Sequence, residues 1–479
     1  MPSLVLLFYA RARARRYNEL VEGELTFDWP ASHETVAEEC RAAREGVAFF
    51  DQSYFGKFVI SGPDAGAAVQ WLCGADMEGR AEGTVTYTPL CNARGGVEAD
   101  LTFTRLYDGA GWYIAAGGNT ATKDLAWIRR VLDDGGFDAH VRDESAARAL
   151  LTVQGPRSRE LLASLVDGGA ARLADEAFPF STCRELVIAG HPVRCLRLTF
   201  VGELGFEVRR GGRRERRERE RRRDECARAQ LHIPSESASD VYAKLREVRC
   251  LRERAGEVAG ALRAVRARRQ AGDALEASTG APVRDAGYRA IDSLSAEKNY
   301  RHWHADLSNS DTPLEAGIGF TVLPKLKRSD APQFIGREVC VCVCVCVCRA
   351  RFDFSVEGAH SLRSQALEAQ RASGLRRKLV CLVLDDASAP PLHGAETIWR
   401  DGVCVGIVRS TAFGHSIGRT IAYGYVSCES DASVAKITNK WLSAGTYEIG
   451  NKGERLSAAL HLKAPFDPEN KRIRGEYGA

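Results

Sequence analysis

One strand of this chain is interrupted in its middle, and this interruption constrains the fold more than any other feature. Residues 199–208 (Thr-Phe-Val-Gly-Glu-Leu-Gly-Phe-Glu-Val) are typical of a tight turn that joins two strands. An arginine-rich run follows, and strand-like sequence resumes only at Leu231-His232-Ile233-Pro234. We therefore expect a folded framework whose strand continues after the run, with foreign-looking segments inserted into it.

The arginine-rich run also explains the basic charge. The 479 residues carry a formal charge of +4, to which residues 209–228 contribute +6 and residues 249–285 contribute +3. The rest of the chain is therefore mildly acidic, at −5. Because the basic segments lack interleaved aromatic residues, we do not expect nucleic-acid binding. No apolar run approaches the roughly eighteen residues that a membrane-spanning helix needs, so we expect no membrane partner.

Five of the fifteen cysteines alternate with valine between Cys340 and Cys348. Alternation would place all five thiols on one face of a strand, which does not suit a tetrahedral zinc site. A translated dinucleotide repeat gives the same pattern, and we favour that origin. The other cysteines form no CxxC pairs, so we predict no metal site and a reducing compartment.

Short, mixed helical and strand patterns without a GxGxxG motif favour an α+β fold over a doubly wound nucleotide-binding fold. We expect helices at 32–44, around 71–72 and at 119–133, and strands at 55–60, 85–90, 99–105 and 111–116. The C-terminal part changes to strands at 378–384, 396–399, 403–409 and 420–426, with a hairpin signal at Asp401-Gly402. This pattern predicts a small separate β-barrel.

These patterns divide the chain as follows. Residues 1–26 are uncertain: their first sixteen are arginine-rich without acids, as in a mitochondrial transit peptide, or are a chance start, which we favour. The expected parts are a first domain at 27–338, interrupted by insertions at 209–230 and 249–285, a third insertion at 340–365, and the barrel domain at 366–477.

Two carboxylates are candidates for chemistry. Asp100 follows the turn Gly95-Gly96 at the start of a strand, where it would either approach a ligand's ring nitrogens or be an ordinary edge-strand residue in solvent. Glu207 has apolar neighbours on its strand and needs a partner or a ligand if it is buried. Glu203, in the turn, is expected to be exposed.

The run Tyr300-Arg-His-Trp-His-Ala-Asp306 gathers further polar groups. His302 and His304 stand two residues apart and would suit a metal, but no further ligand is evident. A structural or substrate-lining role is the favoured interpretation.

Eleven segments of the framework, taken together, resemble the C-terminal, folate-binding half of the mitochondrial sarcosine dehydrogenases, which has the fold of the glycine-cleavage aminomethyltransferase (T-protein). The runs Tyr300–Leu307 and Ala464–Arg472 favour this family over the dimethylglycine dehydrogenases. The segments are 23–30, 50–57, 92–101, 153–156, 178–182, 200–207, 287–294, 300–307, 313–317, 421–425 and 464–472.

The resemblance implies an activity. In that family an N-methyl amine is oxidised with FAD in an N-terminal domain, and tetrahydrofolate in the C-terminal half captures the one-carbon unit of the resulting iminium. This chain has no glycine-rich dinucleotide fingerprint, so FAD is expected only through a domain that these residues do not contain. The expected partners are thus a folate and an amine-derived iminium, and the expected location is the mitochondrial matrix.

The resemblance also implies site residues. Asp100 matches the catalytic aspartate that contacts folate nitrogens, and Glu207 matches the glutamate that hydrogen-bonds the pterin. Phe200 stands where the aminomethyltransferase has a tyrosine stacked on folate, so the ring is kept and the hydroxyl is lost. The folate-site arginine falls at Ile291, with Arg289 displaced beside it.

Other interpretations remain. A non-catalytic member of the superfamily, similar to the regulatory subunit of pyruvate dehydrogenase phosphatase, would act by protein contact, and a truncated product would have no stable fold. The three insertions suggest unspliced intron, since family-like sequence resumes in register from Val208 to Leu231 and from Val339 to Ala366. Tryptic peptides from these segments in the native protein would refute that hypothesis.

Overall fold

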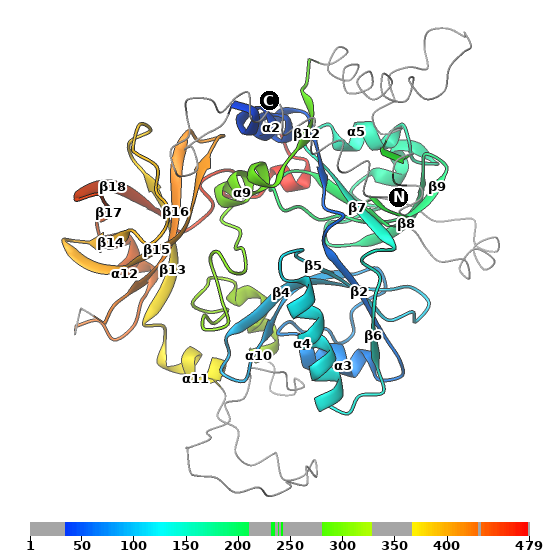
Figure 1. Cartoon of the computed structure of the whole chain (residues 1–479), viewed down its shortest axis with the longest axis horizontal. Helices are drawn as coiled ribbons and strands as arrows, with labels where there is room; N and C mark the ends of the chain where they lie inside the picture. The colour runs from blue at the N-terminus through cyan, green and yellow to red at the C-terminus, as the bar shows by residue number, and fades with distance from the viewer. Residues whose placement is uncertain are drawn as a thin grey trace, which may run out of the picture.

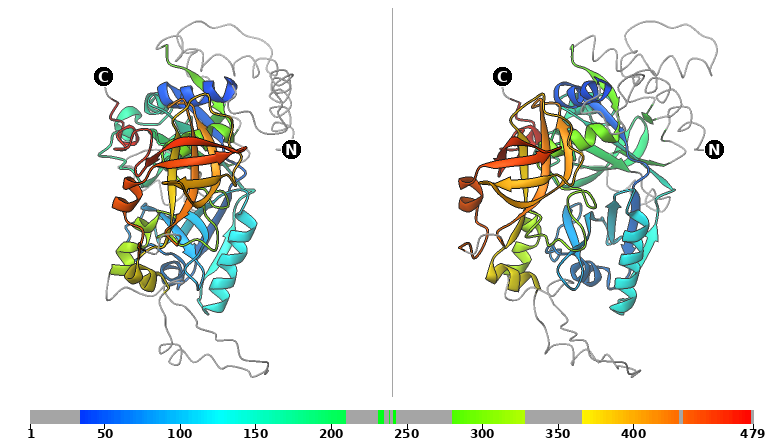
Figure 2. Two further views of the ribbon diagram at one scale, coloured as in Figure 1. Left: turned by 90° about the vertical axis from the view of Figure 1, so that its left-hand side faces the viewer. Right: turned by 60° about the vertical axis from the view of Figure 1, so that its left-hand side comes forward.

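The structure is a computed structural model that describes residues 34–209, 231–234, 238, 241–242, 280–327, 366–429 and 433–477. Over these ranges the chain forms two open sheets and a closed barrel, arranged around a common centre (Figure 1). Turning the molecule brings the barrel in front of both sheets (Figure 2). Among the helices described, none has the length and apolar character needed to cross a bilayer. Residues 1–33, most of 209–279 and the Val–Cys tract lie outside the described residues.

A five-stranded sheet, in the order β3-β4-β5-β2-β6, carries two helices on one face. Apolar side chains of both helices pack on Leu101 and Phe103 of β4. Because neighbouring residues of a strand face opposite sides, Asp100 and Thr102 face away from these helices. The elements are β2 (Gly56–Ser61), α3 (Ala65–Leu72), β3 (Val85–Cys91), β4 (Val97–Arg105), β5 (Trp112–Ala116), α4 (Ala121–Asp134) and β6 (His140–Asp143).

A seven-stranded sheet is covered by helices on both faces. Along its strand β1, Val47 and Phe49 pack with α5, whereas Ala48 and Phe50 pack with α2 and α9. The elements are α2 (Glu34–Glu45), β1 (Val47–Asp51), β7 (Arg148–Gln154), α5 (Ser158–Ala163), η1 (Gly169–Leu173), β8 (Cys183–Ile188), β9 (His191–Leu196), β10 (Gly205–Arg209), β11 (Leu231–Pro234), β12 (Val283–Ala286) and α9 (Tyr288–Glu297).

Strands β10 and β11 are two halves of one strand. Glu207 of β10 pairs with Thr152 of β7, and Leu231 of β11 pairs with Leu151, the next residue along β7. Along β7 the register therefore passes from residue 207 to residue 231 without a gap, whereas on β9 Arg209 and His232 are both paired with Arg194. The expected continuation of the interrupted strand at Leu231 is confirmed.

Six strands close the C-terminal barrel, in the order β13-β16-β15-β14-β17-β18. The turn between β14 and β15 has φ values of 50° at Asp401 and 80° at Gly402, as a two-residue hairpin requires. The strands are β13 (Arg377–Leu384), β14 (Thr397–Arg400), β15 (Val403–Gly414), β16 (Arg419–Ser427), β17 (Tyr447–Asn451) and β18 (Glu454–His461). Shorter elements are η2 (Gly319–Thr321), α10 (Leu323–Lys327), α11 (Ala366–Ser373), α12 (Asn439–Ala444) and η4 (Arg472–Arg474). The α+β class and the separate barrel are as predicted.

Candidate functional site

The β3–β4 hairpin brings Tyr87 beside Asp100. The Tyr87 hydroxyl donates a hydrogen bond of 2.8 Å to Asp100 Oδ2. The connecting turn is held by Asn92, whose Oδ1 accepts from the backbone N–H groups of Arg94 and Gly96 at 3.0 Å each. Since β4 lies between β3 and β5, the alternative that Asp100 is a solvated edge-strand residue is wrong.

The pKa of the Asp100 carboxyl is shifted toward neutral pH. Burial raises its pKa to about 7, the hydrogen bond from Tyr87 opposes this shift, and the charges of Asp124 and Asp306 add to it. Burial, followed by the charge of Asp100, raises the pKa of Tyr87 well above its usual value. Asp100 therefore changes its charge near pH 7, which suits a group that accepts or relays a proton.

Asp100 lines a cavity of about 110 Å³, the inner cavity. The Phe200 side chain lines it from the turn at 199–204, and Arg301 and Trp303 line it from the segment after α9. Tyr288, at the start of α9, adds another aromatic ring. The inner cavity thus combines one carboxyl group with aromatic surfaces contributed by separate parts of the chain.

A larger cavity of about 490 Å³, the outer cavity, adjoins the inner one. Asp292 of α9 and Asp306 line it, together with Ser410 of the barrel strand β15. Burial raises the pKa of Asp292, the nearby His302 opposes the shift and Asp306 adds to it. The two cavities share Asn119, Thr120, Tyr288, His302 and Trp303.

The segment between the cavities is held firmly. Trp303 donates from Nε1 to the carbonyl of Val97 at 2.8 Å, and the Lys123 ammonium lies 3.9 Å from the centre of its ring. His302 Nε2 lies 2.8 Å from the Ser295 hydroxyl. Among the described residues no three His, Cys, Asp or Glu side chains are grouped as a metal would need. His302 and Trp303 line both cavities, in line with the lining role that the sequence favoured.

The turn at 199–204 is organised by Thr199. Its hydroxyl oxygen accepts hydrogen bonds from the backbone N–H groups of Val201, Gly202 and Glu203, at 3.3, 2.9 and 3.2 Å. Gly202 has φ of +75°, and a Cβ there would lie 2.2 Å from the Lys298 side chain, so only glycine suits this position. The turn is therefore packed closely against α9.

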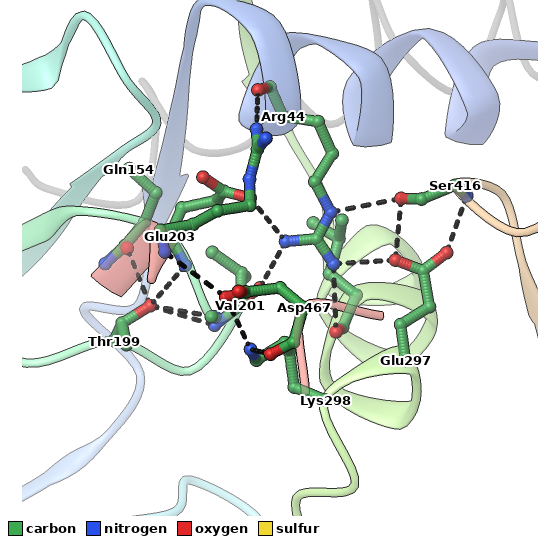
Figure 3. A network of polar contacts seen from close by, with 12 residues as sticks. Arg44, Gln154, Thr199, Val201, Glu203, Glu297, Lys298, Ser416 and Asp467 are labelled. Atoms are coloured by element: carbon green, nitrogen blue, oxygen red, sulfur yellow. Dashed lines mark hydrogen bonds and ion pairs between the residues drawn. The ribbon is translucent and has the colours of Figure 1, made fainter. Parts of the chain in front are cut away.

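The expectation that Glu203 is exposed is wrong, because its side chain is 0% exposed. Its Oε1 accepts from the guanidinium of Arg44 at 2.9 Å and from that of Arg472 at 2.6 Å. Arg44 also binds Glu297 at 2.6 Å, and Lys298 binds Asp467 at 2.9 Å. Figure 3 shows Arg44 lying between the two glutamates. We call these three cations and three carboxylates the Arg44 cluster: Arg44, Glu203, Glu297, Lys298, Asp467 and Arg472.

Comparison with known proteins identifies the family of this chain. The GCVT N-terminal domain matches residues 6–214 and 262–325, and the glycine cleavage T-protein C-terminal barrel domain matches residues 377–467. The chain belongs to the glycine cleavage T-protein family. The breaks between the matches, at 215–261 and 326–376, overlap the segments that look foreign in the sequence.

Individual relatives agree with this membership of the T-protein family. The chain is 40% identical over 473 residues to the mitochondrial sarcosine dehydrogenase of Homo sapiens, covering 96% of this chain and 42% of that protein, in its C-terminal portion. It is 27% identical to an aminomethyltransferase of Symbiobacterium thermophilum, covering 92% and 91%. The aminomethyltransferase structure from Bartonella henselae shares the fold, with a TM-score of 0.61, 21% identity and 91% coverage of each chain.

The structure brings together only some of the residues that the T-protein resemblance singles out. Asp100 and Phe200 line the same inner cavity. The backbone of Glu207 lies in β10, but its side chain is outside the described residues. Arg289 is on α9 and is not among the residues that line either cavity.

Sequence reasoning missed Tyr87 and Asp292, whereas Arg301 belongs to the run at 300–306 for which a structural or lining role was favoured. The pairing of β3 with β4 was a usable signal for Tyr87, because both strands were expected on either side of one turn. Asp292 occurs within the matched family segment at 287–294, yet nothing local marks it as facing a cavity. Its placement depends on how α9 packs against the barrel.

Proposed function

We propose that this chain is the tetrahydrofolate-dependent, one-carbon-accepting part of a sarcosine dehydrogenase of the mitochondrial matrix. The observation that carries the proposal is the Asp100 carboxyl, which has a pKa of about 7 and lines an aromatic cavity beside a larger acidic one. The 40% identity to human mitochondrial sarcosine dehydrogenase supports the choice of substrate and compartment.

The residues of the inner cavity fit a reduced pterin. A carboxylate accepts hydrogen bonds from N–H groups, and Asp100 provides such a carboxylate. Tyr87 already donates a hydrogen bond to one of its oxygens. The Phe200 side chain and Tyr288 offer apolar and aromatic surface to a flat ring. We propose that Glu207 accepts further pterin N–H groups and that Arg289 contributes through its charge on the neighbouring Asp292 of α9. Tetrahydrofolate, when bound, supplies the amine nitrogens that take up the one-carbon unit.

The outer cavity fits a cationic donor. Asp292 and Asp306 provide negative charge, and Tyr300 and Tyr423 provide aromatic rings, a combination that attracts cations. An amine-derived iminium would thus be held next to Asp100. Since Asp100 is charged only above about pH 7, capture should become more effective as the pH rises through this value.

Oxidation of the amine is proposed for the part of such dehydrogenases that this chain does not match. The chain spans 42% of the human relative, and FAD would act in the remaining length of a protein of that kind. The residues described here would receive the product of that oxidation and not carry it out.

Calorimetric titration of the full chain with 5-formyltetrahydrofolate, a stable reduced folate, tests the proposal. We expect binding by the wild-type chain, and at least tenfold weaker binding by Asp100→Asn and by Glu207→Gln, because each loses a charge-assisted hydrogen bond worth about 1.5–3 kcal/mol. The exposed residues Asp133 and Glu176 provide matched controls as Asp133→Asn and Glu176→Gln.

Wild-type affinity in both site variants would refute the site assignment. A folded wild-type chain that binds no reduced folate would refute the function itself, and the regulatory, non-catalytic alternative would then be preferred.

A further inference from the structure

The wall of the inner cavity that carries Phe200 does not support itself. The turn at 199–204 belongs to no strand, and the N–H groups of Val201, Gly202 and Glu203 converge on the Thr199 hydroxyl. The Arg44 cluster fixes the turn through Glu203 (Figure 3), while Gly155 and Gln154 at the end of β7 bind the Leu204 carbonyl and the Thr199 hydroxyl. This support comes from residues that are distant from the turn in the sequence.

Much of it comes from residues 466–477, the last that the structure describes, which we call the C-terminal strap. Arg472 donates from Nε to Glu203 Oε1 at 2.6 Å and from a second nitrogen to the carbonyl oxygen of Arg44. The Tyr477 hydroxyl accepts a hydrogen bond from the Leu204 N–H at 3.3 Å. The strap therefore contacts both the carboxylate and the backbone of the turn.

Two further contacts hold the strap to α9, whose residues line the outer cavity. Lys298 binds both the side chain and the carbonyl of Asp467, at 2.9 and 2.7 Å. The Phe466 N–H donates to the carbonyl of Glu297 at 3.0 Å. The Arg44 guanidinium lies 4.3 Å from the centre of the Phe466 ring. The strap thus links the wall of one cavity to the helix that lines the other.

The strap itself is only partly buried. Ile473 is its one buried residue, with 8% of its surface exposed, and residues 468–471 are exposed. A segment with few buried apolar contacts opens at a lower free energy than a domain core. Docking and release of the strap are therefore accessible without unfolding either sheet.

We infer that the C-terminal strap is a positioning element, whose docking through Arg472 orders the Glu203 turn and thereby sets the affinity of the inner cavity for its ligand. Strap docking and ligand binding then favour each other, because a ligand that needs the ordered turn binds only the docked form. By linkage the effect is reciprocal, so the ligand should also hold the strap in place. The identity of that ligand as a reduced folate rests on the proposed function.

Amide hydrogen exchange of the full chain tests the strap without any ligand. In Arg472→Ala we expect faster exchange at Val201–Leu204, with the amides of β4 unchanged, because β4 is held by its pairing with β3 and β5. Arg472→Lys keeps the charge and should restore much of the protection. Lys463→Ala removes an exposed ion pair with Glu469, a residue of the strap, and should change nothing because solvent screens such a pair.

Titration with 5-formyltetrahydrofolate adds the functional readout. We expect about tenfold weaker binding by Arg472→Ala, an intermediate affinity for Arg472→Lys and wild-type affinity for Lys463→Ala. In the wild-type chain the ligand should slow exchange at residues 472–477.

Faster exchange of Arg472→Ala throughout the chain, or unchanged exchange at the turn, would overturn the inference, as would loss of turn protection with no change in folate affinity. If the wild-type chain binds no folate, the proposed function fails, yet the exchange experiment still decides whether the strap orders the turn.

Discussion

The two walls of the inner cavity are built in different ways. Asp100 is held by Tyr87, thirteen residues away in the same hairpin. Glu203, which supports the Phe200 wall, is held by Arg44 and by Arg472, which are 159 and 269 residues distant. One wall is a local structure, whereas the other exists only when α2, α9, the barrel and the end of the chain have assembled. Binding at this site would therefore depend on the whole described chain, although the Tyr87–Asp100 contact itself needs only the pairing of β3 with β4.

The largest effect should come from removing the central cation of the assembled wall. Arg44→Met leaves Glu203 and Glu297, both 0% exposed, without their shared partner. Breaking a buried ion pair in this way costs about 3–5 kcal/mol of unfolding free energy. Urea denaturation measures it, with Arg41→Met on the exposed side of α2 as the control. Equal stability of the two variants would mean that the wall does not depend on the cluster.

The next effect should come from the local wall and depend on pH. The pKa of Asp100 is about 7 in the fold and 3.8 as a reference, so the native state binds more protons between these values. Deprotonation of this carboxyl therefore lowers the unfolding free energy of the protein as the pH rises from about 4 to about 7. The unfolding free energy of Asp100→Asn should rise relative to that of the wild type across this window, and the difference should reach on the order of 1–3 kcal/mol at pH 8.

Denaturation curves measured from pH 4 to pH 8 provide the test, with Asp133→Asn as the exposed control. Stability profiles of Asp100→Asn and wild type that stay parallel across the window would show that Asp100 is not buried as described.

A smaller effect is expected within the Tyr87–Asp100 pair. The Tyr87 hydrogen bond lowers the pKa of Asp100, so Tyr87→Phe should raise it by about 0.5–1 unit, in keeping with a hydrogen bond worth about 1 kcal/mol. The midpoint of the pH dependence of folate affinity reports the shift. In the Asp100→Asn background the same substitution should have no effect on this midpoint. A midpoint that moves in both backgrounds would assign it to another group.

The smallest effect should come from an ion pair outside both walls. Arg130 and Asp134 on α4 lie 3.5 Å apart, with 65% and 70% of their side chains exposed. Arg130→Ala should change the unfolding free energy by no more than about 0.5 kcal/mol, because solvent screens such pairs. If Arg130→Ala lowered the unfolding free energy as much as Arg44→Met, exposed ion pairs and the buried Arg44 cluster would contribute equally to stability, contrary to this prediction.

The same contrast explains what the sequence could predict. The β3–β4 hairpin and the barrel hairpin at Asp401-Gly402 follow from alternation and turn residues, which act over short distances. The burial of Glu203 did not follow, because it depends on arginines far away in the chain. Asp292 was missed for the same reason, since only the packing of α9 against the barrel turns it toward a cavity. The family resemblance supplied Phe200, which local patterns alone would not have singled out.

The unbroken register along β7 has a consequence for the gene. Joining Glu207 directly to Leu231 would preserve both the pairing with β7 and that with β9, where Glu207 pairs with Leu196 and His232 with Arg194. The length of chain between them adds only a loop-closure entropy that grows slowly with length. Coding sequence could be gained or lost at this point with little effect on the sheet, so a transcript without it would encode the same fold.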